Sequence, residues 1–415
     1  MKHMREAANQ TAFERMTESD PVLTDIRPAI EVVPGMSPMT ILTSGPPMPW
    51  AEYFGGQRNA IIGAALFEGL AETREEAISK LDSGTIIVRG CHDYGCIGSL
   101  AGVYSASMKV FVVENRSFGN RGFCNIYEGT NPRRLNYGVY DEGVHERLLY
   151  VENVMAPVIA RAVRRSGGIR LRPIMARALH MGDELHSRNT AASLLFTREL
   201  FAHMLDQVKD DSKKVLRTIE AMTEDNYFFL RLSMAACKTI ADSAKDIDGS
   251  SVVTAMAFNC RNFGVRISGL GDEWILGPHA DVEARLFDGH SEDEITWMGG
   301  DSIIAETVGL GGFAQAAAFP LQQYQGGSAD AMVKRNLGRY DITVGEHPDF
   351  HIPYLGYRGT PTAIDVFKVL DTGILPVMDI GIAGRDGGQI GAGVVSAPRS
   401  VFESACQKYT DRYKL

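Results

Sequence analysis

The pattern of apolar and polar positions predicts both helices and strands in the first third of the chain. Residues 5–17 have helical spacing, and Thr73, with a glutamate three residues on, predicts the start of another helix. The runs 85–88 and 110–113 are β-branched or aromatic and are bounded by glycine or polar residues, which is typical of buried strands. Seven prolines between residues 21 and 50 favour an extended or turning segment there.

The rest of the chain divides into a helical part and a glycine-rich part. Turn residues are sparse between about Val144 and Lys245, where helical spacing dominates. After Gly249 the glycines return, and strands are predicted to alternate with helices. The predicted strands are 252–258 and 265–268, and the predicted helices are 302–318, 329–336, 362–370 and 401–413.

We therefore expect a mixed α/β (α+β) fold, with two mixed α/β lobes and a central helical domain. The expected boundaries are 1–143 for the N-terminal mixed domain, 144–248 for the helical domain and 249–415 for the glycine-rich C-terminal domain.

Composition narrows the classes of protein to consider. The chain has 415 residues, of which 45% are hydrophobic and 22% are charged, which is typical of a globular protein of two or three domains. A net charge of -9 argues against nucleic-acid binding. No apolar run approaches the roughly 18 residues of a membrane helix, and the first 16 residues lack the apolar core of a signal peptide. The sequence predicts a soluble, cytoplasmic protein with no membrane partner.

The first candidate for chemistry is the loop at 89–96, which follows a predicted strand. His92 can act as an acid or base near neutral pH, and Cys91 could act as a nucleophile if its pKa is lowered. The alternative is a simple turn with a buried cysteine and a surface His-Asp pair.

The second candidate follows the next predicted strand. Arg116 and Arg121 offer planar donors suited to a carboxylate or phosphate, and Asn115 and Asn120 flank the glycine-bearing loop beside them. The alternative is a polar loop with solvated arginines.

The third candidate is the segment 180–189, which is predicted to be helical. His180, Glu184 and Arg188 are spaced four residues apart and would share one helical face, as a polar wall of an active site. The alternative is a salt-bridged helix surface. The spacing is not H-E-x-x-H, and the six cysteines form no C-x-x-C pair, so we expect no metal.

The fourth candidate is Arg358 with Thr360 and Thr362, placed before a predicted helix. Hydroxyls and free N–H groups at a helix start, beside an arginine, favour an anion. The alternative is Thr360 as a simple N-cap with Pro361 in the first turn. No G-x-x-x-x-G-K-[ST] motif occurs, so we expect no nucleotide and no other cofactor.

Several motifs together resemble the AllG/YlbE-like family over nearly the whole chain. They are PGMSPMTILTSGPP, CHDYGCIGSLAGVYSASMKVFVVEN, GNRGF, ALHMGDELHSRN, SSVVTAMAFN, RISGLGD, ETVGLGGFA, YRGTPTAIDV and TGILPVMDIGIAG with GQIGAG. The resemblance implies a link to oxamate carbamoyltransferase, in which an AllG-like subunit works beside FdrA-like and AllH-like subunits. That enzyme interconverts oxalurate plus phosphate with oxamate plus carbamoyl phosphate in allantoin breakdown.

Three functional hypotheses follow. In the first, the protein transfers a carbamoyl group to or from a small anion, with His92 or His180 moving a proton, Glu184 assisting, and the arginines binding the anion. In the second, it hydrolyses an amide, imide or ureide bond, with water or Cys91 as nucleophile. In the third, it is a non-catalytic subunit. We also expect a homo-oligomer, and we expect the separate polar loops to fold into one pocket.

Overall fold

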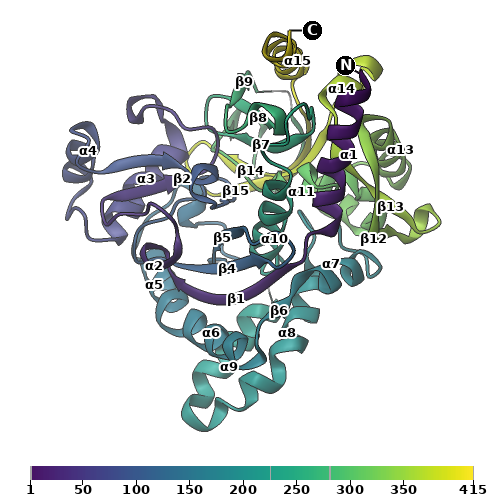
Figure 1. Cartoon of the computed structure of the whole chain (residues 1–415). Helices are drawn as coiled ribbons and strands as arrows, with labels where there is room; N and C mark the ends of the chain where they lie inside the picture. The colour runs from purple at the N-terminus through teal and green to yellow at the C-terminus, as the bar shows by residue number, and fades with distance from the viewer. Residues whose placement is uncertain (1, 225, 280–281, 415) are drawn as a thin grey trace.

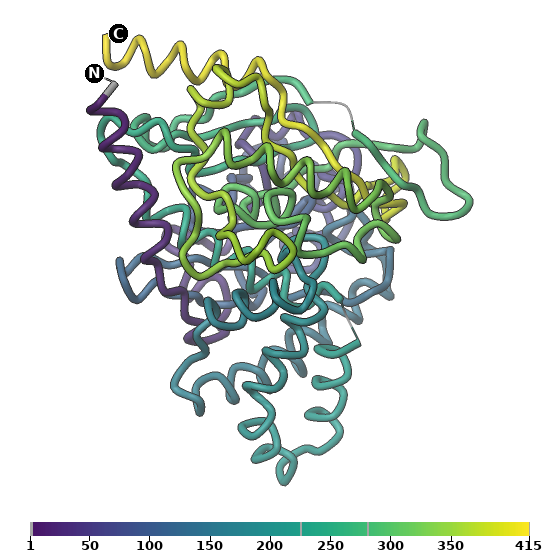
Figure 2. The backbone as a smooth tube through the Cα atoms, turned by 90° about the vertical axis from the view of Figure 1, so that its right-hand side faces the viewer, coloured from purple at the N-terminus to yellow at the C-terminus, as the bar shows by residue number. Residues whose placement is uncertain are grey.

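Figure 1 shows a computed structural model of the chain, which describes residues 2–224, 226–279 and 282–414. Helices and strands intermix throughout, which confirms the predicted mixed α/β class. The first turn of α1 (Lys2–Glu18) and the last turn of α15 (Arg399–Tyr413) lie at the same end of the molecule in Figures 1 and 2.

An antiparallel sheet lies at the middle of the molecule, with its strands in the order β5-β4-β1-β6. The strand predicted at 110–113 is confirmed within β4, and the proline-rich segment begins as β1. The strands of this sheet are β1 (Pro21–Pro28), β4 (Lys109–Asn115), β5 (Arg121–Asn125) and β6 (Ile169–Arg170).

Helix α10 (Leu230–Ser243) packs against this sheet and is buried almost all round. Thirteen of its 14 residues are buried, so it cannot present a solvated polar face. A Cβ at Gly122 of β5 would lie 2.7 Å from the Ala235 carbonyl oxygen, so glycine lets the strand approach the helix. The burial of α10 carries Arg231 and Lys238 into the interior.

The chain between Val144 and Lys245 is mostly helical, as predicted, and its helices within residues 156–166 and 190–224 form the lower end of the molecule in Figure 2. A π-helical turn at Val151–Met155 precedes Pro157, which has no N–H to continue the regular hydrogen-bond pattern. Besides α10, the helices are α5 (Glu142–Tyr150), α6 (Ala156–Ser166), α7 (Leu171–Leu179), α8 (Thr190–Leu205) and α9 (Val208–Glu224).

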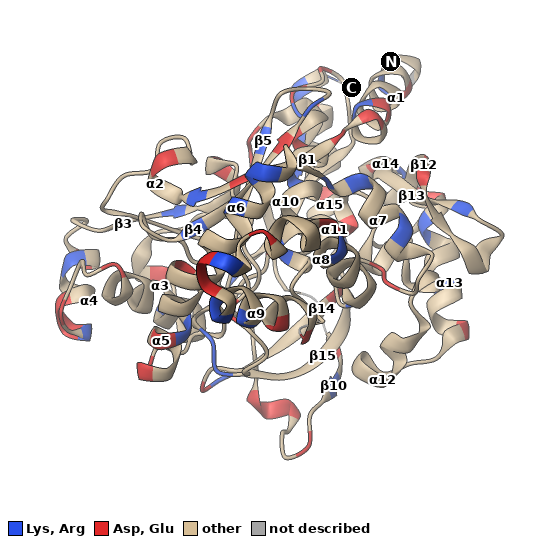
Figure 3. Cartoon of the chain, turned by 90° about the horizontal axis from the view of Figure 1, so that it is seen from below, with Lys and Arg blue, Asp and Glu red and all other residues tan. Residues whose placement is uncertain are grey.

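Charges of both signs intermix on these helices in the view of Figure 3. Arg161 of α6 pairs with Asp210 at 2.5 Å, and Arg165 pairs with Asp206 at 2.6 Å. All four side chains are largely exposed, so each pair adds only about 0–1 kcal/mol.

The N-terminal segment also builds a small parallel pair on the left of Figure 1. The Thr73 hydroxyl accepts a hydrogen bond from the Glu76 N–H, which confirms the predicted N-cap. The elements here are α2 (Ala29–Val32), β2 (Thr40–Thr43), α3 (Gly55–Phe67), α4 (Arg74–Asp82) and β3 (Ile87–Gly90).

The C-terminal segment forms three sheets, with orders β7-β8-β9, β10-β15-β14-β11 and β12-β13. The stretch from β10 to β11 projects from the body of the molecule in Figure 2. The strands are β7 (Val253–Phe258), β8 (Phe263–Ile267), β9 (Ile275–Gly277), β10 (Val282–Leu286), β11 (Ile295–Thr296), β12 (Thr343–Ile352), β13 (Arg358–Ile364), β14 (Val377–Gly384) and β15 (Gln389–Ser396). The helices before α15 are α11 (Ile304–Thr307), α12 (Gln322–Gln325), α13 (Ala329–Arg339) and α14 (Val366–Thr372).

Three predicted helices in candidate regions are wrong in whole or in part. The single helix expected at 302–318 is instead the short α11 followed by 3-10 turns. The helix expected at 362–370 begins only at Val366, because residues 358–364 pair with β12 as β13. The chain leaves the helix after α7 ends at Leu179, so residues 180–189 form a loop.

The largest buried apolar cluster joins all three segments of the chain. It contains Met16, Phe111, Phe196, Ala235 and Phe350, all fully buried. The helices between α5 and α10 therefore share one core with the strands on both sides of them in sequence. The division into three domains at residues 143 and 248 stays a prediction.

Candidate active site

A cavity of about 40 Å³, called the inner cavity below, lies where the three segments meet. Its walls come from the loops after β3, β5, α7, α9 and β11, from α10, and from β14 and β15. The polar residues that line it are Ser99, Arg134, Asn136, His186, Ser187, Arg231, Ser302 and Gln389. A small enclosed space with two arginines and several hydroxyls suits a compact anion.

Arg231 and Asn136 carry polar atoms that no described protein group satisfies. The Nε and Nη1 atoms of Arg231 have no hydrogen-bond partner among the described residues, although the side chain is buried. The same holds for both Nδ2 and Oδ1 of Asn136. Leaving such donors and acceptors unpaired in the interior costs about 1–3 kcal/mol each, so these atoms indicate a place for a ligand.

Arg134 forms another part of the wall and is held by its neighbours. Its Nη2 donates to Gln389 Oε1 at 2.9 Å, and its Nη1 donates to the Gly129 carbonyl at 3.1 Å and to the Tyr127 hydroxyl. These contacts fix the guanidinium in the cavity wall.

His186 is oriented by a buried carboxylate. Its Nδ1 lies 2.8 and 3.0 Å from the two oxygens of Glu306, and Glu306 Oε1 also accepts from the Gly312 and Asp379 N–H groups at 2.9 and 3.0 Å. Burial alone would lower the pKa of His186, but the charge of Glu306 and its hydrogen bond outweigh burial and raise that pKa. His186 lines the cavity, so this pair can hold or move a proton there.

Two glycines permit this arrangement. A Cβ at Gly311 would lie 2.2 Å from Glu306 Oε1, and one at Gly312 would lie 2.1 Å from the Val377 carbonyl oxygen. The glycine-dense run after α11 therefore brings backbone N–H groups against the carboxylate and packs the turn against β14.

Two further carboxyl groups surround the His186–Glu306 pair. Burial, with the nearby charges of Asp379 and Glu306, raises the pKa of Glu184 well above its usual range. Burial and Glu306 raise the pKa of Asp379 to about 6. Glu184 accepts from the His186 and Arg188 N–H groups at 2.7 and 2.6 Å, so it fixes the turn that presents His186.

The backbone is strained at two points beside the cavity. Leu100, which lines it, has φ 51°, and Leu185, which precedes His186, has φ 72°. Such values are unfavourable for leucine and often occur at functional sites, where the surrounding structure holds them.

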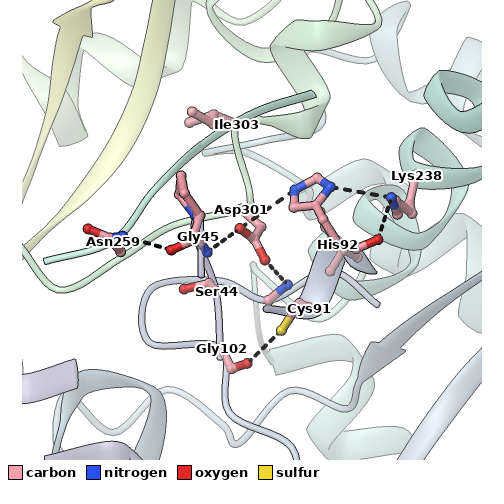
Figure 4. Close-up of polar contacts among 12 residues, drawn as sticks. Ser44, Gly45, Cys91, His92, Gly102, Lys238, Asn259, Asp301 and Ile303 are labelled. Carbon is pink, nitrogen blue, oxygen red and sulfur yellow. Dashed lines mark hydrogen bonds and ion pairs between the residues drawn. The ribbon is translucent and has the colours of Figure 1, made fainter. Parts of the chain in front are cut away.

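A second buried cluster, the Asp301 cluster, consists of His92, Lys238 and Asp301 (Figure 4). Lys238 Nζ lies 3.3 Å from His92 Nδ1, and His92 Nε2 lies 3.6 Å from Asp301 Oδ1. Because an ammonium group can only donate, Nδ1 accepts and the imidazole hydrogen lies on Nε2, facing Asp301. Burial, with the charge of Lys238, lowers the pKa of His92 well below its usual range, so the ring is neutral.

Asp301 ties together segments that form the cavity wall. It accepts from the Gly45 N–H at 2.7 Å and from the Gly98 N–H at 3.1 Å. Ser99 and Ser302, the next residues along each segment, line the cavity. Arg231 and Lys238 are seven residues apart on α10, about 10 Å along the helix, so this helix connects the inner cavity with the Asp301 cluster.

The ionisation of Asp301 gives a testable dependence of stability on pH. Burial raises its pKa to about 7, so the folded state binds more protons than the unfolded state between about pH 4 and 7, and stability falls as pH rises through that range. The cost of ionisation is on the order of 4 kcal/mol. Urea unfolding of wild type and Asp301→Asn at pH 5 to 8 measures it. The wild-type free energy of unfolding should decline more steeply than that of the variant, and equal slopes would contradict this account.

The predicted catalytic residues lie in three different environments. Glu184 is buried beside His186, and His92 is buried behind the cavity wall in the Asp301 cluster. His180 is exposed and its ring lies against His351 and Tyr357.

The predicted anion-binding residues are engaged elsewhere. Arg116 and Arg121 are exposed at the β4–β5 turn, Arg188 pairs with Asp183 at 2.7 Å, and Arg358 is exposed and pairs with Glu346 at 2.6 Å. The side chains of Asn115 and Asn120 both donate to the Thr239 carbonyl, so they hold the fold together. Thr360 and Thr362 are buried within strand β13.

The prediction that His92, Arg116, His180 and Arg358 share one pocket is wrong for the described residues. The helix start expected behind Arg358 is a strand, and the helical face expected at 180–188 is a loop, so neither geometry exists. Sequence reasoning missed the residues that do meet: Arg134, Asn136, His186, Arg231 and Glu306. The sequence did hold one signal for Arg231, because Arg231 and Lys238 are long, charged side chains in a helix made mostly of small or apolar residues.

The surroundings of Cys91 argue against the hypothesis that its thiol acts as a nucleophile. Its Sγ donates to the Gly102 carbonyl at 3.3 Å, and burial, with the charge of Asp301, raises the pKa of the thiol well above its usual range. A thiol held in this way is a poor nucleophile. Among the described residues, no group of three or more His, Cys, Asp or Glu side chains is placed to hold a metal ion.

The comparison with known proteins identifies the family. The family model described as "Oxamate carbamoyltransferase subunit AllG" matches residues 86–302. The Escherichia coli K12 protein named oxamate carbamoyltransferase subunit AllG is 35% identical over 405 residues, which covers 96% of each chain. The chain belongs to the AllG family.

Two further proteins are similar to this chain over nearly its whole length. The uncharacterised protein YahG of Escherichia coli K12 is 40% identical over 409 residues, covering 98% of this chain and 86% of YahG. A crystal structure of a conserved protein of unknown function from Enterococcus faecalis V583 superposes with a TM-score of 0.95 at 36% identity, covering 98% of both chains. The fold of this AllG-family chain is therefore also seen in a solved structure.

Across residues 2–224, 226–279 and 282–414, no helix is both long and apolar enough to cross a membrane.

Proposed function

We propose that this protein is a subunit of a carbamoyl-transferring enzyme that acts on a small anionic amide or ureido substrate of the oxamate and oxalurate type and binds the phosphate group of the other reactant in the inner cavity. The observation that carries the proposal is the pair of unsatisfied buried groups, Arg231 and Asn136, beside His186 in a cavity of about 40 Å³. The AllG-family relative whose name includes oxamate carbamoyltransferase supports this choice of chemistry.

The cavity supplies the groups that such a reaction needs. Attack of an amide nitrogen on the carbamoyl carbon of carbamoyl phosphate forms an N–C bond and breaks the C–O bond, and phosphate leaves with the electron pair. Arg231 and Arg134 stabilise the negative charge that develops on the leaving phosphate and the carbonyl oxygen. The attacking amide loses a proton to His186, which then passes it to phosphate.

His186 fits both directions of this transfer. Glu306 holds Nδ1 and stabilises the imidazolium, so the ring can take the proton in synthesis and return it in phosphorolysis. Hydrolysis, the second hypothesis, would use the same donors with water as nucleophile.

A reaction assay separates these hypotheses. The purified chain, alone and with FdrA-like and AllH-like subunits, is incubated with oxalurate and phosphate in ¹⁸O-labelled water. We expect phosphate-dependent formation of carbamoyl phosphate, with activity that requires the partner subunits or rises with them. Solvent oxygen in the product without dependence on phosphate would favour hydrolysis. Activity of the complex that is unaffected by substitutions at Arg231 and His186 would instead favour a non-catalytic subunit.

A further inference from the structure

A groove of about 500 Å³, called the outer groove below, lies directly beside the inner cavity. Four residues line both spaces: Tyr127, Arg134, Tyr227 and Gln389. We call these four residues the partition. The two spaces are therefore separated by one layer of side chains.

The partition is held by side-chain contacts. Arg134 Nη2 donates to Gln389 Oε1 at 2.9 Å, and Gln389 Nε2 donates to the hydroxyl of Tyr324 in the outer groove. The rings of Tyr127 and Tyr227 stack with their centroids 6.3 Å apart. Tyr127 and Arg134 are buried, whereas Tyr227 and Gln389 are half-buried, so rotation of these last two side chains would join the two spaces without movement of the fold.

The size of the inner cavity limits what it can hold. A cavity must have a volume of about 10–15 Å³ to hold one water molecule, so the 40 Å³ of the inner cavity can hold a few groups of that size. A group transfer requires both reactants in contact, with reacting atoms about 3–3.5 Å apart. The inner cavity is too small for two reactants, and the second must approach from an adjoining space.

The chemistry of the two spaces differs in a way that assigns the reactants. The inner cavity has the hydroxyls of Ser99, Ser187 and Ser302 with Arg231, which suit the oxygens of a phosphate group. The outer groove has aromatic faces from Tyr227, Phe287 and Tyr324, which suit a flat compound. Arg133 and Arg134 line it beside Glu224, and Arg133 also pairs with Asp141 at 2.9 Å, so Arg134 is the better placed of the two arginines for a carboxylate. Arg133, Phe287 and Tyr324 line the outer groove but not the inner cavity.

We infer that the outer groove is a second binding site, which takes the carbamoyl acceptor, a small planar amide with a carboxylate, while the inner cavity holds the phosphate group of the donor and the carbamoyl group of the donor lies at the partition. The two reactants meet at the partition. This assignment rests on the proposed function, because it requires a reaction with two substrates.

Calorimetry on the full chain tests this assignment with inorganic phosphate and oxamate as the probes. Phe287→Trp narrows the outer groove without touching the inner cavity, and Phe118→Trp is the matched control. Phe118 lies at the β4–β5 turn and is 40% exposed, against 38% for Phe287. We expect Phe287→Trp to weaken oxamate binding in saturating phosphate at least tenfold and to change the Kd of phosphate less than twofold, with no effect of the control.

The outcomes separate the two proposals. If phosphate binds through Arg231 but oxamate is indifferent to Phe287→Trp, competes with phosphate or fails to bind, the second site is overturned while the inner cavity stands. If phosphate does not bind, or binds independently of Arg231, both proposals fail. An outer groove filled by a partner subunit in the complex would also overturn the second site.

Discussion

Replacing Arg231 by methionine is expected to weaken the binding of a small anion, tested with phosphate and carbamoyl phosphate, by about 10- to 100-fold. Arg231 lines the inner cavity, and its Nε and Nη1 atoms have no hydrogen-bond partner among the described residues. A hydrogen bond to a charged group contributes about 1.5–3 kcal/mol, which corresponds to the expected loss of affinity. Methionine keeps much of the length and apolar volume of the side chain but removes the charge and all donors. Calorimetric titration of the purified chain measures the change.

The control for this variant is Arg339→Met. Arg339 is also buried, but it donates to the backbone carbonyls of Arg335 and Leu375 and does not line the inner cavity. Loss of a buried arginine lowers stability in both proteins, so the free energy of unfolding should fall in both. Only Arg231→Met should lose the anion. Equal affinity in wild type and Arg231→Met would remove Arg231 from the site.

Replacing Glu306 by glutamine is expected to lower kcat by about 10²–10⁴-fold, the usual contribution of general acid–base catalysis. Glutamine preserves the shape of the side chain but removes the charge that raises the pKa of His186. The limb of the pH–rate profile that reports His186 should move to lower pH, because burial then dominates its pKa. Steady-state rates of the assembled complex between pH 5 and 9 measure both effects.

Glu152→Gln provides the comparison for this variant. Glu152 is a largely buried carboxylate that accepts from the Lys109 backbone N–H at 2.9 Å, and it lies away from the inner cavity. The Glu152→Gln variant should keep the wild-type pH–rate profile. If Glu306→Gln lowers the rate without moving the profile, Glu306 supports the fold around Gly312 and Asp379 and does not tune His186.

The sequence predicted elements whose signals are local and missed those that depend on distant contacts. The N-cap at Thr73 and the strand at 110–113 follow from nearby residues alone. Residues 358–364 became a strand because β12, which precedes them, supplies a pairing partner that no local pattern shows.

The site was harder to predict for a related reason. His186 gains its role from Glu306, 120 residues away in sequence, and Arg231 gains its role from the burial of α10 against β4 and β5. Motif-based reasoning favoured loops with several polar residues together, such as 115–121. Those residues are solvated or bonded to the scaffold, whereas the cavity residues come from several segments that are far apart in the sequence.

The most direct test of the inner cavity is a crystal structure of the chain grown with carbamoyl phosphate or with phosphate and oxamate. The account predicts an anion in the inner cavity, with Arg231 Nε or Nη1 and Asn136 Nδ2 within 3.2 Å of its oxygens and His186 facing it. An anion bound instead at Arg358, at the β4–β5 turn or at another surface, with the inner cavity holding only water at saturating ligand, would contradict it.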